Sequence, residues 1–521
     1  MLIPDEFENL TPAEEKLLAE CGKPGRIMIG EGEVPETDGP AVNIRAGLIR
    51  HLLTASDSPL DGKGIRLRGA HITGPLDLQG IDCSRDITLT ACRISDPITV
   101  INAAMRGLHI SGCAMGSLHA DNARFSGSLY IRRDSRVKGE LSLAGTRIAG
   151  DLQICGCAIE SEGQDAIFAA SLRVEGSVFL GNYPYSDGVT TLEATGGLFF
   201  SSAHVGHDFF ITNTAISPQA DPVADAVFGA TEEHGRDIAL SLSRAKVGGI
   251  LYFQDNQISS GVVNLAGADV ARLKDEPEGP GATYALRLDG FRYSDFSRHT
   301  DISLKARLSW LERRPADMEF VAQPYEQLAQ VLAHLGHRND AKSVLMAKEH
   351  LLRVENRRLM RERGQWGRYI PSALLGWVFG RTVGYGYRPG RALGLALVLI
   401  VALGVFFQKT WDAGDMTPNA APVLISADWI AATVEHPDGP AAFWSQPGQA
   451  GQDWETFNAY AYSADLFIPI INLGQESAWA PSTSRSDWGR VGWWLRWFAK
   501  AVGWMITALV AAGITGMIRQ E

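Results

Sequence analysis

Residues 76–83 read LDLQGIDC, residues 87–94 read ITLTACRI, and residues 98–105 and 108–115 read ITVINAAM and LHISGCAM. Allowing for small deviations, the stretches share one eight-residue pattern, which we call a phrase. It consists of an apolar residue, any residue, an apolar residue, any two residues, a small residue, any residue and a final apolar residue. Alternating apolar residues are typical of a short strand with one buried face. The phrase returns every 10 to 12 residues, and a fixed short period is the sequence signature of a solenoid.

The same register extends over much of the N-terminal half of the chain. The first apolar residues of its phrases are Ile65, Leu76, Ile87, Ile98, Leu108, Leu118, Leu129, Leu141 and Leu152. After a looser stretch the phrase returns at Leu198, Phe209, Leu240, Leu251 and Val263. Because two phrases of about 22 residues suit one turn of a narrow solenoid, we predict a mainly β fold, with a right-handed parallel β-helix over residues 61–270.

These phrases resemble the pentapeptide-repeat and related β-helix proteins of bacteria, over roughly residues 60–270. The chain departs from the strict five-residue motif, so the resemblance implies a relative of that architecture. A β-sandwich with short strands is the alternative, but its loops vary in length and would not keep so constant a spacing. Cysteines at inward positions, such as Cys83, Cys92 and Cys113, are expected to be small reduced core residues.

Composition limits the classes of function. The chain has 521 residues and a net charge of −11, so we expect no nucleic-acid partner. It lacks a Rossmann glycine fingerprint, a P-loop, HExxH and GxSxG. Cys155 and Cys157 have no further ligands at metal-binding spacing. We therefore expect no cofactor, no metal and no catalytic residue, and, because solenoids usually act through their surfaces, a protein partner on the side wall.

Helical patterns flank the repeat. Residues 1–60 include an apolar helical pattern at 42–53, which is expected to cap the first turn of the β-helix. Residues 271–322 are predicted to be an exit loop followed by a capping helix at 304–313. Residues 323–390 form a predicted basic helical neck that begins with a tetratricopeptide-like hairpin.

Two apolar stretches predict transmembrane helices, at about 391–408 and 498–518, within a last region of residues 391–521. Residues 341–391 carry 11 Lys/Arg and three Asp/Glu, whereas residues 409–490 carry three Lys/Arg and ten Asp/Glu. The positive-inside rule then places the β-helix, the neck and both termini in the cytoplasm and the 409–490 loop outside. We predict a multi-pass protein of the bacterial inner membrane, with the lipid bilayer as one partner.

Aromatic residues mark the predicted membrane interface. Trp493, Trp494 and Trp497 cluster before the second span and are expected to anchor it at the headgroup level. Residues 382–386 read TVGYG, which is the filter sequence of potassium channels. Because this stretch precedes the first span on the basic side, we interpret it as a turn whose Tyr385, Tyr387 and Arg388 also anchor the chain at the interface.

A better pore candidate lies between the two spans. Residues 457–476 combine a semi-apolar helical half with a polar end, and a re-entrant segment of this kind is tolerated where it lines a cavity. In a homo-oligomer its acidic residues would form a ring that favours cations. The alternative is an amphipathic helix on the outer membrane surface. The candidate residues are Asp465, Asn472, Gly474, Gln475 and Glu476.

Over roughly residues 320–520 the chain also resembles bacterial membrane-anchored proteins in which a β-helix-like region precedes two spans. The matching stretches are residues 384–389 and 462–477, and some such proteins are labelled membrane-associated oxidoreductases. The main hypothesis is a membrane-anchored cytoplasmic β-helix that acts as a protein-interaction or scaffold module. The alternatives are an oligomeric two-span ion channel with a cytoplasmic sensor solenoid, and a membrane-associated oxidoreductase.

Overall fold

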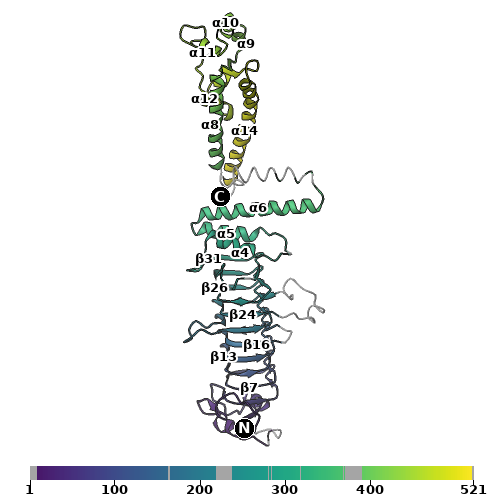
Figure 1. Cartoon of the computed structure of the whole chain (residues 1–521). Helices are drawn as coiled ribbons and strands as arrows, with labels where there is room; N and C mark the ends of the chain where they lie inside the picture. Colours follow the sequence, from purple (N-terminus) through teal and green to yellow (C-terminus); the bar gives the residue numbers. More distant parts are fainter. Residues whose placement is uncertain are drawn as a thin grey trace. The chain divides into compact units, whose positions relative to one another are not determined.

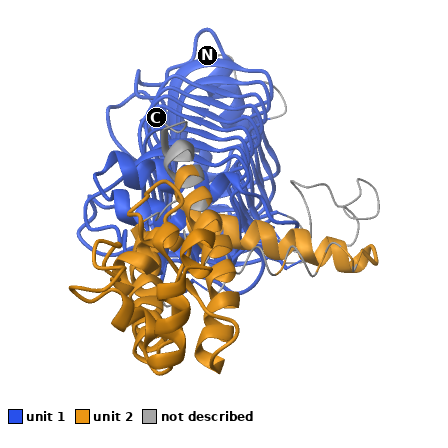
Figure 2. Cartoon of the chain, turned by 90° about the horizontal axis from the view of Figure 1, so that it is seen from above, with its two compact units in different colours: residues 1–344 blue, residues 345–521 orange. Residues whose placement is uncertain are grey.

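The structure is a computed structural model of the chain. It describes residues 9–161, 165–218, 238–279, 284–316, 318–365 and 390–518, together with positions 7, 281, 282, 367, 369 and 373. The chain forms two compact units, residues 1–344 and residues 345–521, which are coloured separately in Figure 2.

The first unit is a parallel β-solenoid over residues 65–296, followed by helices (Figure 1). One turn runs through β8 (Ile98–Thr99), β9 (Ala104–Ser111) and β10 (Ala114–Met115). Strands one turn apart pair in parallel, so Ile65 lies opposite Ile87 and Ile87 lies opposite Leu108. These pairs are 22 and 21 residues apart, and the predicted two-phrase turn is therefore confirmed.

The described strands of the turns fall into a long sheet and a shorter one. One strand position of the long sheet contains β6 (Asp82–Thr90), β9, β12 (Arg124–Phe125), β15 (Arg147–Ile148), β18 (Arg173–Val174), β22 (His204–Val205), β26 (Lys246–Gln254), β29 (Asp269–Asp275) and β31 (Arg292–Phe296). The shorter sheet contains β5 (Leu76–Asp77), β8, β11 (Leu118–His119), β14 (Leu141–Ser142), β17 (Ile167–Phe168), β21 (Leu198–Phe199), β25 (Ile238–Ser241), β28 (Val262–Asn264) and β30 (Ala285–Arg287).

The core of the solenoid consists of apolar ladders that run along its axis. In one ladder, each residue lies opposite the equivalent residue of the next turn. The strands that contribute are β6, β9, β13 (Leu129–Lys138), β16 (Leu152–Glu160), β19 (Val178–Gly181), β23 (Phe209–Thr212) and β26. Its members are Ile87, Leu108, Leu129, Leu152, Val178, Phe209 and Leu251, and all are buried. Burial of one such side chain stabilises the fold by about 1.5–3 kcal/mol, so the repeat itself supplies the core.

The corners of the solenoid repeat the same backbone geometry. Asn102 and Asn122 adopt left-handed conformations at φ 57° and 55°, and Gly145 occupies the equivalent corner one turn later at φ 66°. Asparagine and glycine are the residues that adopt this conformation at the lowest cost. The corners therefore let short strands follow one another closely.

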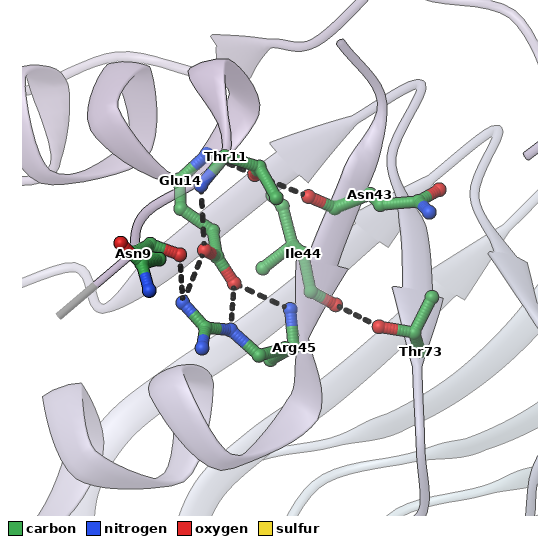
Figure 3. A network of polar contacts seen from close by, with 7 residues as sticks. All are labelled: Asn9, Thr11, Glu14, Asn43, Ile44, Arg45 and Thr73. Carbon is green, nitrogen blue, oxygen red and sulfur yellow. Dashed lines mark hydrogen bonds and ion pairs between the residues drawn. The ribbon is translucent and has the colours of Figure 1, made fainter. Parts of the chain in front are cut away.

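A helical cap covers the N-terminal end, as predicted from residues 42–53. The cap contains α1 (Pro12–Glu20) and α2 (Ala46–Thr54), and the chain enters α2 from strand β2 (Asn43–Arg45). Thr11 caps α1 and forms a capping box with Glu14. The buried Glu14 carboxylate also accepts bonds from the main-chain and side-chain nitrogens of Arg45, at 2.7–2.9 Å (Figure 3). The cap is thereby joined to the edge of the sheet.

The C-terminal end of the solenoid extends further than the repeat indicated. Strands β29, β30 and β31 continue the parallel pairing to Phe296, across residues that the sequence predicted as an exit loop. The capping helix α4 (Leu304–Glu312) follows, close to the predicted 304–313. Its buried Arg307 forms two hydrogen bonds to the carboxylate of Asp275, at 2.7 and 3.0 Å. This ion pair joins the cap to the last turns.

Two further helices follow the solenoid cap, and the tetratricopeptide-like packing of this segment stays a prediction. The first helix, α5 (Gln323–His334), begins with a proline in its first turn, and Gly336 has φ 90° in the turn that follows. The second helix, α6 (Arg338–Glu362), begins in the first unit and continues into the second.

The second unit is mainly helical. It contains α8 (Gly390–Asp412), α9 (Ala421–Leu424), α10 (Ala427–Glu435), α11 (Pro440–Trp444), α12 (Ala459–Phe467), α13 (Gln475–Ala478) and α14 (Asp487–Ile518), with a small antiparallel pair of β32 (Met416–Pro418) and β33 (Trp479–Pro481). Among the described residues, α8 is the one helix long and apolar enough to cross a membrane. The second predicted span lies on α14, where side chains from 512 onward are outside the described part, and it stays a prediction.

Candidate functional site

The predicted pore segment packs directly against both long helices of the second unit. A Cβ at Gly404 of α8 would lie 2.4 Å from the Tyr460 ring of α12. A Cβ at Gly503 of α14 would lie only 1.9 Å from the carbonyl oxygen of Phe467, at the end of α12. The two glycines therefore allow α12 to approach both helices closely, and the buried Tyr462 and Leu466 extend the shared core.

Asp465 has a structural role in this segment. Its buried carboxylate accepts hydrogen bonds from the main-chain nitrogens of Leu473 and Glu476, both at 2.8 Å. The second of these nitrogens belongs to the first turn of α13, where a carboxylate satisfies N–H groups that lack helical partners. Both carboxylate oxygens are thus engaged in fixing the loop between α12 and α13.

Glu476 is paired with cations from α14. Its carboxylate lies 2.9 Å from the Arg496 guanidinium and also contacts the ammonium of Lys500. Burial raises the pKa of Glu476, but the hydrogen bonds and charges of Lys500 and Arg496 outweigh that effect and hold the pKa below its usual value. Glu476 is therefore ionised at neutral pH, and its charge is neutralised within the unit.

Of the remaining predicted residues, Asn472 and Gly474 lie in the loop between α12 and α13, and Gln475 is the first residue of α13. The Gln475 amide donates to the carboxylate of Glu455 and to the carbonyl of Thr456, both at 2.9 Å. Asn472 accepts the main-chain N–H of Gly474, which adopts a left-handed φ of 79°. A pocket of about 400 Å³ brings together three predicted residues, Asp465, Asn472 and Glu476, with Arg496, Lys500 and Trp504 of α14.

The predicted interface anchors are only partly described. On α14, Trp494 and Trp497 are exposed and Trp493 is half-buried, with its ring edge-on to Trp494. Tyr385, Tyr387 and Arg388 lie outside the described residues, as does the whole of the filter-like stretch 382–386.

The side wall of the solenoid carries a feature that the sequence analysis missed. Arg124 pairs with Arg147, Arg147 with Arg173, Arg173 with His204, and His204 with Lys246, one residue per turn. All five side chains are exposed. We call these residues, Arg124, Arg147, Arg173, His204 and Lys246, the cationic ladder. At the ~4.8 Å spacing of paired strands, it extends for about 19 Å.

The arginines of this ladder lie on consecutive turns and repel one another, and neither they nor Lys246 are neutralised by neighbouring carboxylates. Among the described residues no carboxylate lies within ion-pair distance of Arg124, Arg147, Arg173 or Lys246. Arg106, on the same wall, differs because it pairs with Asp86 at 2.6 Å. Two unit charges about 5 Å apart in water repel by roughly 0.8 kcal/mol before screening by salt. The ladder therefore lowers the stability of the solenoid.

A groove of about 800 Å³ runs along the ladder, and we call it the side-wall groove. Beside the cations, two residues further along each strand, lies a strip of small residues. Its members are Ser126, Ala149, Gly206 and Gly248, with Glu175 between the second and third. The described lining contains four Lys/Arg and two Asp/Glu, the acids being Asp82 and Glu175. In a chain with net charge −11, this groove is locally cationic.

An aromatic ladder lies at another strand position of the long sheet, on β19, β23 and β26. Phe210 stacks on Phe179 with ring centroids 4.8 Å apart and on Tyr252 at 4.2 Å. The Lys274 ammonium lies 5.7 Å from the centre of the Tyr252 ring, and Tyr183 packs edge-on against Phe179. The ring faces are thus covered by each other or by neighbouring side chains, so this ladder supports the register and offers little open surface for stacking a planar ligand.

No ligand set for a metal ion is present in the described part of the chain, since His, Cys, Asp and Glu do not gather there in groups of three or more. Burial raises the pKa of Cys155 to about 12, so this thiol stays protonated. Comparison of the chain with protein-family models, with curated proteins and with solved structures gives no match.

Proposed function

We propose that this protein is a membrane-anchored recognition module whose solenoid binds a protein partner through its side wall. The side-wall groove carries this proposal, because an exposed ladder of unpaired cations lowers stability and is the kind of feature that a binding surface retains. The apolar helix α8 supports the anchoring part. Its outward aliphatic side chains, such as Leu397 at 64% and Val398 at 63% exposure, suit contact with lipid.

In this proposal the basic segment before α8 lies on the cytoplasmic side and the acidic region after it lies outside, because residues 341–391 are basic and residues 409–490 are acidic. The second span would be the C-terminal half of α14. The chain would then be a multi-pass inner-membrane protein with both termini and the solenoid in the cytoplasm.

An ion channel is the second candidate function, and the packing of α12 favours it. A short helix held against α8 and α14 has the arrangement of a pore helix beside two spans. The ion pairs of Glu476 weigh against an acidic ring, because a carboxylate neutralised by Arg496 and Lys500 attracts a passing cation only weakly.

Ion flux into liposomes separates the two functions. Purified full-length protein is compared with Glu476→Gln and with Asp453→Asn, a matched control at an exposed carboxylate of the same region. The recognition module predicts no flux above empty liposomes for any of the three proteins. Flux that changes in selectivity with Glu476→Gln but not with Asp453→Asn would refute the proposal and support the channel.

Partner binding is tested in cells with the full chain. A photo-reactive residue is placed at Ser126 in the side-wall groove or, as a control, at the exposed Arg136 on another face. We expect a defined cross-linked protein from position 126 that is absent from position 136. The same products at both positions, or none from Ser126 in a folded membrane-inserted protein, would contradict a side-wall recognition role.

A further inference from the structure

The side-wall groove selects among classes of partner by its charge pattern. Basic residues follow one another at every turn from Arg124 to Lys246. The run is bounded by carboxylates, since Asp82 lies two turns before Arg124 and Asp269 lies one turn after Lys246. A complementary ligand therefore carries several negative charges in a line of limited length, about 19 Å.

Arginine supplies three of the five ladder positions. The guanidinium group presents a rigid fork of N–H donors that matches carboxylate and phosphate oxygens in pairs. Because the ladder arginines are exposed and have no carboxylate partner among the described residues, these donors face solvent. The chemistry of the groove thus points to carboxylates or phosphates on the ligand.

Two features disfavour a uniform polyanion or a nucleic acid. Glu175 lies inside the lining beside the small-residue strip, so a ligand with a negative charge at every unit would place one against this carboxylate. Single strands of nucleic acid are bound by stacking bases on open aromatic faces. The adjacent rings of Phe179, Phe210 and Tyr252 are stacked on one another and do not provide such faces.

A polypeptide with spaced acidic residues meets these conditions. One carboxylate per helical turn gives a spacing of about 5.4 Å, and alternate residues of an extended chain are about 6.6 Å apart. Both values suit flexible arginines held at intervals of ~4.8 Å. The neutral residues between the acids would lie on the strip of Ser126, Ala149, Gly206 and Gly248, where small side chains allow close approach.

We propose that the side-wall groove binds an acidic segment of a protein partner, whose carboxylates pair with Arg124, Arg147, Arg173 and Lys246. The proposal rests on the recognition function above and names the chemistry of its partner. It assigns the binding to one face of the solenoid, so other exposed arginines should not contribute.

The test measures binding of a labelled peptide to the full-length protein in lipid nanodiscs, by fluorescence anisotropy. The probe has about 16 residues with one glutamate per helical turn among alanine and serine, and a second peptide has glutamine in place of each glutamate. The groove variant is Arg147→Gln/Arg173→Gln. The matched control is Arg136→Gln/Lys138→Gln, which removes the same charge at exposed positions of β13 that lie outside the groove.

We expect the glutamate peptide to bind, the groove variant to weaken binding roughly tenfold, and the control variant to change it less than about twofold. Binding should also weaken with salt, since the charges are exposed. Equal losses in both variants, or equal binding of the glutamine peptide, would overturn the proposal. Inorganic polyphosphate or single-stranded DNA that binds more tightly than the peptide, and only with an intact ladder, would overturn the assignment to a protein segment.

The outcomes also separate this inference from the proposed function. A partner cross-linked from Ser126 in cells, together with failure of the acidic peptide to bind, refutes the acidic segment and leaves the recognition module standing. Failure of both experiments in protein that is folded and inserted refutes both.

Discussion

Substitution of Arg307 should open the C-terminal end of the solenoid. The Arg307 side chain is fully buried, and its guanidinium donates two hydrogen bonds to Asp275 and a third, at 2.7 Å, to the carbonyl of Asp301. It also lies 4.3 Å from the centre of the Phe296 ring. In Arg307→Met the apolar contact is largely kept, while the Asp275 carboxylate is left buried without its cation.

The expected cost follows from that isolated charge. Removal of one partner from a buried ion pair destabilises a protein by about 3–5 kcal/mol. Because each turn of a solenoid contacts only its neighbours, the loss should be confined to the turns next to α4. We therefore expect amide hydrogen exchange in β29 and β31 to become roughly 10²- to 5 × 10³-fold faster, the factor that corresponds to this range. Amides of β13, several turns away, should be unchanged.

The double variant Asp275→Leu/Arg307→Met provides the internal control. It removes both charges, and replacement of a buried pair by apolar residues is often nearly neutral, so much of the protection should return. Acceleration of less than about tenfold in the single variant would show that the pair contributes little. Equal exchange in the single and double variants would show that the isolated carboxylate is not the cause.

Three further predictions concern other parts of the chain. Gly503→Val should separate α12 from α14, because its Cβ would lie 1.9 Å from the Phe467 carbonyl oxygen; we expect a loss of at least 1–3 kcal/mol in the thermal unfolding of the detergent-solubilised protein, whereas Gly394→Ala, in open space, should have little effect. Phe210→Ala removes two stacked contacts and should cost about 1–3 kcal/mol in denaturant unfolding; an unchanged midpoint would contradict a role of the aromatic ladder in stability. Burial raises the pKa of the Glu14 carboxyl, but hydrogen bonds and the charge of Arg45 outweigh that effect and hold the pKa below its usual value. The ionised carboxylate therefore stabilises the folded N-terminal cap above pH about 4.5, and this stabilisation is lost as the pH falls through the folded-state pKa. Amide exchange in α1 should become faster over that pH range in the wild type, and Glu14→Gln should abolish the pH dependence.

The solenoid could be predicted from the sequence because inward residues must repeat at the period of the strands. Leu108 and Ile110, for example, are alternate apolar residues in the sequence, and both are buried in the core. The last turns were missed because their inward positions are occupied by large aromatic residues such as Tyr293 and Phe296, and because the proline-rich segment around Glu276 interrupts the spacing. The pattern of small and aliphatic residues therefore ended before the pairing of strands did.

The side-wall groove escaped the sequence analysis for a different reason. Successive phrases alternate between two faces of the solenoid, so residues of one face are found only in every second phrase. At the position before the last apolar residue, alternate phrases give Arg124, Arg147, Arg173, His204 and Lys246. Reading the sequence at the period of one turn, rather than one phrase, would have revealed this run of basic residues.

The roles of Asp465 and Glu476 could not be foreseen. Glu476 pairs with Arg496 and Lys500, which are 20 and 24 residues away along the chain, and such a pair depends on how α13 packs against α14. Asp465 bonds to main-chain nitrogens of a loop whose path the sequence does not specify. The sequence placed these acids in one segment, whereas packing determined their partners.

Because the turns pair regularly, mutations that add or remove a whole turn can change the length of the cationic ladder. Duplication of one turn of about 22 residues would add one rung of ~4.8 Å and, with it, one more basic side chain in line with the others. Loss of a turn would shorten the ladder by the same amount. Gene duplication within the repeat could thus adjust how many charges a partner must present without any redesign of the individual turn.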